Sequence, residues 1–83
     1  MVVMVLGRRY YRYPDHWVVV RRARKRYVCD DCGRAIEAGD LYIERVFACT
    51  HNQYLRERLC LDHLAPDVER IVDRKGKVLW ERG

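Results

Sequence analysis

Two pairs of residues in the chain have the types and the spacing of metal ligands. Cys29 and Cys32 stand in Cys-Asp-Asp-Cys-Gly, and Cys60 and His63 repeat the two-residue gap in Cys-Leu-Asp-His. Thiolate sulfur and imidazole nitrogen suit tetrahedral zinc, and four such ligands leave no open position for a catalytic water. The spacing therefore predicts one structural Zn²⁺ site formed by Cys29, Cys32, Cys60 and His63.

The same pairs have two other interpretations. A Cys-x-x-Cys redox pair belongs in a βαβ setting, whereas the residues after Cys32 indicate a hairpin. Cys60 and His63 could also be a core cysteine and a surface histidine, which would make their spacing a coincidence.

Three residues outside the pairs need separate explanations. Cys49 and His51, one residue apart, could act as an extra or substitute ligand pair, but a buried free cysteine and a turn histidine explain them more simply. His16 follows Pro14-Asp15 in an expected loop, and we expect it to face solvent rather than a metal.

The length of the chain makes such a site important for folding. Eighty-three residues form one small domain whose hydrophobic core supplies roughly a few kcal/mol. A structural zinc site contributes about 10 to 16 kcal/mol of apparent binding free energy, so metal binding and folding are expected to be one event. The thiols would require a reducing cytoplasm. No segment approaches the roughly 20 apolar residues of a membrane span, and residues 2–6 are too short for a signal-peptide core, so we expect a soluble, unprocessed protein.

Local patterns predict an α+β domain of residues 1–83 in three parts. Residues 1–28 are a basic strand pair, in which the apolar runs 2–6 and 17–20 could pair as a long-looped hairpin, the second run continuing to residue 26. Residues 29–73 hold a zinc knuckle, a central hairpin of strands 41–49 and 54–59, and a helix. Residues 74–83 are a short strand or tail.

The helix is predicted from one amphipathic pattern. Apolar residues recur at the i, i+3, i+4 and i+7 spacing of a helix face, at Leu61, Leu64, Ala65, Val68, Ile71 and Val72. Pro66 places the start either near Leu61, with one backbone hydrogen bond lost, or at Pro66 as the first helical residue. Lys75-Gly76-Lys77 would end it.

The order of knuckle, hairpin and helix resembles the treble-clef zinc-finger superfamily over about residues 27–73. The resemblance is carried by Cys29, Cys32, Gly33, the turn at Gly39-Asp40, Cys60 and His63. It implies a structural metal, since treble clefs usually use all four ligands to hold the fold. It does not fix a function, because that superfamily includes ribosomal proteins, transcription-factor modules, nucleases and protein-binding fingers.

Some treble clefs resemble His-Asn-His nucleases, and His51-Asn52 with His63 invites that comparison. His63 is assigned to zinc here, however, and no acid-histidine pair stands in the first hairpin strand to act as general base and second metal ligand. We therefore expect no catalytic residues and no enzymatic activity, with a nuclease-related treble clef as a minor alternative.

The positive charge lies almost entirely before the zinc ligands. Residues 1–28 carry eight Arg or Lys against the single acid Asp15, a net charge of +7, whereas the remaining 55 residues carry nine basic and eleven acidic side chains. Arginine neutralises phosphates and tyrosine stacks on bases. This half therefore predicts binding of DNA or RNA through Arg8, Arg9, Tyr10, Tyr11, Arg12, Arg21, Arg22, Arg24, Lys25 and Arg26.

The same basic half is also consistent with a protein-interaction surface or with a merely solvated face. The apolar runs 2–6 and 17–20 offer strand edges for pairing with a protein partner or a second copy of the chain. The leading expectation is a nonenzymatic nucleic-acid-binding protein, a small regulator of prokaryotic or viral origin, with no membrane partner and no small-molecule substrate. The alternative is an adaptor or homodimerising zinc finger.

Overall fold

The computed structural model describes residues 2–11, 15–48 and 54–83. This part of the chain is 52% strand and 4% helical, so the prediction of an α+β domain is wrong. The elements are β1 (Val2–Val5), β2 (His16–Arg22), β3 (Tyr27–Val28), β4 (Ala35–Ile36), β5 (Leu41–Ala48), β6 (Tyr54–Leu59), the 3₁₀ turn η2 (Leu61–His63), β7 (Val68–Val72) and β8 (Val78–Glu81). No helix among these residues is long and apolar enough to cross a bilayer.

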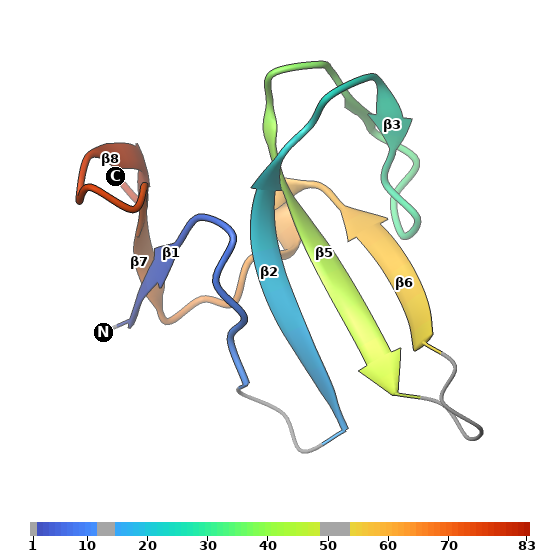
Figure 1. The fold of residues 1–83 in the computed structure, drawn as a ribbon. Coiled ribbons are helices and arrows are strands. Elements are labelled where there is room, and N and C mark those ends of the chain that lie inside the picture. Colours follow the sequence, from blue (N-terminus) through green and yellow to red (C-terminus); the bar gives the residue numbers. More distant parts are fainter. Residues whose placement is uncertain (1, 12–14, 49–53) are drawn as a thin grey trace.

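The strands form three sheets with the orders β1-β7-β8, β2-β5-β6 and β3-β4 (Figure 1). The predicted central hairpin is confirmed as β5 and β6, paired from Ile43 with Leu59 to Ala48 with Tyr54. The predicted pairing of residues 2–6 with 17–20 is wrong, because β1 pairs in parallel with β7 and β2 pairs antiparallel with β5. The chain between β1 and β2 instead meets β2 through one bridge, Tyr10 with Val18.

The predicted helix after Cys60 is absent. Only the three residues of η2 are helical, and β7 occupies most of the second half of the predicted segment. Proline lacks a backbone N–H and favours extended backbone in the residue before it, so Pro66 prevents η2 from continuing. The β-branched residues Val68, Ile71 and Val72 then favour a strand, for which β1 and β8 supply partners on both sides.

A β-bulge explains why this strand carries a helix-like apolar spacing. Val2 pairs with Val68, but Val3 pairs with Arg70, so Glu69 is an extra residue on the β7 side. The extra residue brings Val68 and Ile71, three positions apart, to the same face of the strand, where both are fully buried. A spacing of three on one face, typical of a helix, arises here from a strand with one bulge.

The segment Lys75-Gly76-Lys77 turns the chain between two strands and does not end a helix. Oδ1 of Asp73 accepts hydrogen bonds from the backbone N–H groups of Lys75 and Lys77, each at 2.9 Å. Gly76 has a φ of 90°, a left-handed conformation that suits glycine. Residues 78–81 form β8, so of the two alternatives for this end of the chain, strand or tail, the structure has the strand.

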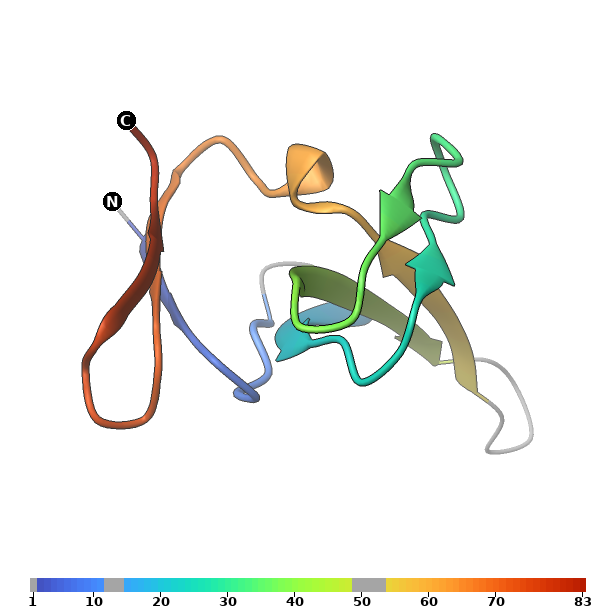
Figure 2. The same ribbon diagram turned by 90° about the horizontal axis from the view of Figure 1, so that it is seen from above.

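Buried side chains form two clusters. The first, called the metal-side core, consists of Ala23, Cys29, Ile36, Tyr42, Ile43, Leu59 and Cys60; the second, called the junction core, consists of Met4, Val20, Val68 and Ile71. Leu61 and Leu64, on either side of His63, pack against both clusters. Seen from above, η2 lies in the chain that runs from β6 to β7, between the two larger sheets (Figure 2). The segment after Cys60 therefore joins the two halves of the fold.

The junction core gives a direct test of this topology. Ile71→Ala should lower the free energy of unfolding of the zinc-loaded protein by about 2 to 5 kcal/mol, because it empties a fully buried site. Val78→Ala, at a position 43% exposed on the neighbouring strand, should change it by less than about 0.5 kcal/mol. Equal effects of the two variants in urea titrations would contradict the assignment of Ile71 to a core.

Candidate metal centre

The first ligand pair lies in a tight turn between two short strands. β3 and β4 pair through Tyr27 with Ile36 and Val28 with Ala35, and the chain between them carries both cysteines. The turn is closed by Gly33 N–H, which donates to the Cys29 carbonyl at 3.0 Å, and by Cys29 N–H, which donates to the Arg34 carbonyl at 2.9 Å. Gly33 has a φ of 77°, as the predicted knuckle requires.

The second pair follows directly after β6. Cys60 precedes η2, and His63 N–H donates to the Cys60 carbonyl at 3.1 Å, which turns His63 back toward the cysteine. The knuckle is tied to this region at Arg58, whose carbonyl accepts from Asp30 N–H and whose N–H donates to Oδ2 of Asp30, both at 2.8 Å. A charge-assisted hydrogen bond between Arg34 and Asp62 adds a second link.

These elements bring the four predicted ligands together. The ligand atoms of Cys29, Cys32, Cys60 and His63 all lie within 4.8 Å of one another. The sulfur atoms of Cys32 and Cys60 are 3.5 Å apart, close to the separation of about 3.8 Å that Zn–S bonds of about 2.3 Å give at tetrahedral angles. Cys29 and Cys60 are buried, Cys32 is exposed and His63 is half-buried. The cluster could hold a metal ion, and its donor set suits zinc.

The pKa values of the two buried cysteines are shifted in opposite directions. Burial raises the pKa of Cys29, but hydrogen bonds from the backbone N–H groups of Cys32, Cys60 and Asp31 outweigh it and lower that pKa to about 6. Burial raises the pKa of Cys60 to about 11, and the neighbouring thiols of Cys32 and Cys29 add to the shift. A bound cation would favour the thiolate form of both residues.

His63 gives an independent indication of a missing partner. Its Nδ1 lies 3.3 Å from Oδ2 of Asp31, and its Nε2 is the one buried side-chain nitrogen or oxygen in the described ranges with no hydrogen-bond partner. A buried nitrogen without a partner is costly. Coordination of a metal ion by Nε2 would remove that cost, with Asp31 orienting the ring through Nδ1.

Of the other candidate ligands, only His16 is described, and it is not part of the cluster. Cys49 and His51 lie outside the described residues. His16 is half-buried rather than solvent-facing, with its ring centroid 4.7 Å from that of Phe47 and its Nδ1 2.8 Å from Oδ1 of Asp15.

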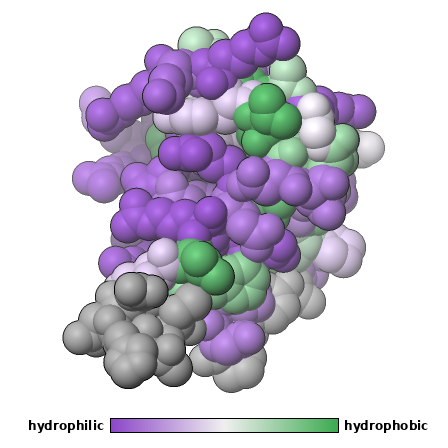
Figure 3. All heavy atoms as spheres, turned by 90° about the vertical axis from the view of Figure 1, so that its right-hand side faces the viewer, coloured by the Kyte–Doolittle hydropathy of each residue, from purple (hydrophilic) through white to green (hydrophobic). Residues whose placement is uncertain are grey.

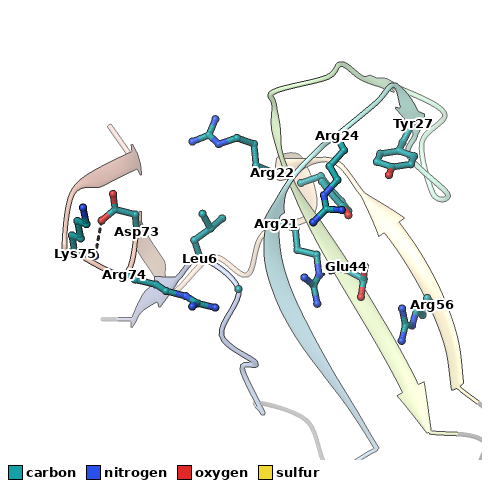
Figure 4. A pocket seen from close by; sticks show the side chains of 12 residues that line it. Leu6, Arg21, Arg22, Arg24, Tyr27, Glu44, Arg56, Asp73, Arg74 and Lys75 are labelled. Carbon is teal, nitrogen blue, oxygen red and sulfur yellow. Dashed lines mark hydrogen bonds and ion pairs between the residues drawn. The ribbon is translucent and has the colours of Figure 1, made fainter.

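The basic residues predicted to bind nucleic acid are divided among several places. Arg21, Arg22 and Arg24 line an open groove of about 810 Å³ together with Arg56, Arg74 and Lys75 (Figure 4). The last three belong to the part of the sequence with excess acidic residues. No linear pattern identifies them, because only the folding of β6 and of the β7–β8 turn brings them beside β2.

The remaining predicted residues contact other parts of the surface. Arg9 and Tyr11 lie beside Trp17, whereas Tyr10 packs against the junction core. Lys25 lies over the ring of Tyr27 at 5.9 Å, and Arg26 pairs with Glu37 at 3.2 Å. Arg8 is exposed next to Gly7, and Arg12 lies outside the described residues.

Comparisons with known proteins found no matching protein family, no similar curated protein and no similar solved structure. The resemblance to treble clefs therefore rests on the ligand spacing and the hairpin. The helix that it implies is replaced by η2 and β7.

The ligand assignment predicts which substitutions remove the metal. Cys60→Ser or His63→Ala should weaken zinc binding by more than about 100-fold, because each variant removes a ligand. Loss of a residue that only hydrogen-bonds a ligand typically costs about 10- to 100-fold. Cys49→Ser should retain one zinc per chain. Elemental analysis after dialysis measures both outcomes, and a fall in metal content for Cys49→Ser would show that the fourth ligand is assigned wrongly.

Proposed function

We propose that this chain is a nonenzymatic structural-zinc protein that binds nucleic acid through the groove between β2 and the β7–β8 turn. The observation that carries this proposal is the gathering of six basic side chains around one opening, against two acids, Glu44 and Asp73. Arg21 and Glu44 lie on the β2–β5 side of the opening, and Arg74 extends toward them from the β7–β8 side (Figure 4).

The acids leave most of this positive charge available. Glu44 is buried and pairs with Arg21 at 3.5 Å, and Asp73 accepts the backbone hydrogen bonds of its own turn. In the described part of the chain, no carboxylate pairs with Arg24, Arg56, Arg74 or Lys75. Cations of this kind attract phosphates, and displacement of the counterions around the phosphates favours binding.

A closed metal site supports the nonenzymatic part of the proposal. Three thiolates and one imidazole complete a tetrahedral shell and leave no position for a reactive water. Reduced thiols require a reducing compartment, so we place the protein in the cytoplasm, where a small regulator would meet DNA or RNA.

The surface on the β6 side fits the adaptor alternative less well. Hydrophilic residues cover most of this face and hydrophobic residues form separate patches (Figure 3). The exposed apolar residue Leu55 belongs to β6, a strand that also carries Arg56, Glu57 and Arg58. Charged edge strands of this kind oppose pairing with another chain.

The groove predicts a specific dependence on charge. The triple variant Arg24→Ala, Arg56→Ala, Arg74→Ala should bind an oligonucleotide at least about tenfold more weakly near 50 mM salt, and the slope of log affinity against log salt should fall by about two to three, because three phosphate contacts are lost. Fluorescence anisotropy with labelled single-stranded DNA, duplex DNA and RNA at two salt concentrations measures both quantities.

A matched control separates the groove from net charge. The triple variant Arg26→Ala, Arg70→Ala, Lys77→Ala loses the same charge outside the groove and should weaken binding by less than about threefold. Zinc content should be unchanged in both triple variants. Equal losses of affinity in the two triple variants would show that net charge, not the groove, determines binding. No binding of any nucleic acid near 50 mM salt would favour the adaptor.

A further inference from the structure

A group of aromatic side chains lies on the same face of the sheet as part of the basic groove. Trp17 stands opposite Val46, and Val46 stands opposite Arg56, which also lines the groove. Tyr54 lies two residues before Arg56 on β6 and therefore projects from the same face. This face thus carries Trp17, Tyr54 and a groove arginine side by side.

The segment before β2 adds a third ring to this face. Tyr10 N–H donates to the Val18 carbonyl at 2.8 Å, and Val18 N–H donates to the Tyr10 carbonyl at 3.1 Å, so residues 9–11 run antiparallel along the outer edge of β2. This register sets Tyr11 opposite Trp17. Because neighbouring residues alternate between faces, Arg9 and Tyr11 lie with Trp17, and Tyr10 packs into the core on the other side.

The rings form one contiguous group. The centroid of Trp17 is 5.8 Å from that of Tyr11 and 5.7 Å from that of Tyr54. The guanidinium of Arg9 lies 4.6 Å from the Trp17 ring centroid and donates a hydrogen bond of 3.2 Å to the Tyr11 hydroxyl. These contacts hold the rings in place before any ligand binds, which lowers the entropic cost of stacking on them.

The two tyrosines of this group are exposed, whereas Trp17 is half-buried and the sheet beneath is covered. Val19 and Val46, on the same face, are 2% and 3% exposed, whereas Tyr11 and Tyr54 are 63% and 55% exposed. The tyrosine rings therefore do more than cover the sheet, and they present aromatic surface beside Arg9 and Arg56. Exposed rings next to arginines are the features with which proteins stack the bases and neutralise the phosphates of single strands.

We propose that this face binds single-stranded nucleic acid, with bases stacked on Tyr11 and Tyr54, which Trp17 supports, and with the phosphate backbone passing Arg56 into the basic groove. This proposal rests on the nucleic-acid function proposed above and specifies that the ligand is single-stranded. A duplex keeps its bases stacked on one another, so it would meet the groove cations but not the aromatic rings.

The first test needs no variant. The zinc-loaded protein is titrated with a labelled oligothymidylate, with an abasic oligonucleotide of equal length and charge, and with a duplex, at one salt concentration. The oligothymidylate should bind about 5- to 160-fold more tightly than the abasic strand for each base stacked. Equal affinity for the two strands would overturn the proposal while leaving the groove intact, whereas failure of all three ligands to bind would remove the nucleic-acid function itself.

The second test locates the stacking. The double variant Tyr11→Ala, Tyr54→Ala should lose most of the preference for the oligothymidylate and keep its affinity for the abasic strand. Leu55→Ala is the matched control, because Leu55 is 63% exposed on the same strand but faces the other side of the sheet. Zinc content confirms that each variant is folded. A double variant that behaves as Leu55→Ala does would exclude these rings as the base-binding site.

Discussion

Four candidate metal ligands bring two distant parts of the chain together. A metal ion held by Cys29, Cys32, Cys60 and His63 would fix the knuckle against the segment that follows β6. Leu61 and Leu64 in that segment pack against both hydrophobic clusters, so the position of one short turn determines how the two larger sheets meet. The roughly 10 to 16 kcal/mol that a structural zinc site contributes matches or exceeds the whole stability of a typical domain, about 5 to 15 kcal/mol.

The ligand cluster could be predicted from the sequence because it depends on residue type and spacing. The two ligand pairs, each with a two-residue gap, and the turn glycine Gly33 can be recognised from short stretches of sequence. The hairpin between the two pairs has clear strand patterns. The helix could not be predicted correctly, because the apolar spacing from Val68 to Ile71 has two physical origins. A helix and a bulged strand both bring residues three positions apart to the same face. The pairing with β1, which lies far away in the sequence, and with β8 decides in favour of the strand.

The residues that line the basic groove could be predicted only in part. The sequence concentrates positive charge in residues 1–28, but the structure assigns Arg26 to an ion pair and Arg22 to a hydrogen bond with the Gly39 carbonyl. It adds Arg56, Arg74 and Lys75 from the half with net negative charge. The metal and the surface are linked, because β6 both leads into Cys60 and carries Tyr54 and Arg56. A bound metal would thus support the scaffold on which the proposed binding groups are arranged.

The most direct test of this account is hydrogen exchange measured by NMR on the zinc-loaded protein and on the same protein after complete chelation under reducing conditions. The backbone amides of Val68 and Ile71 in β7 are the probes, because these residues belong to the junction core and are not metal ligands. The account predicts that zinc removal abolishes their protection together with that of β5 and β6. Retained protection in β7, or a metal-free protein that stays cooperatively folded, would contradict the claim that the metal holds both halves of the molecule.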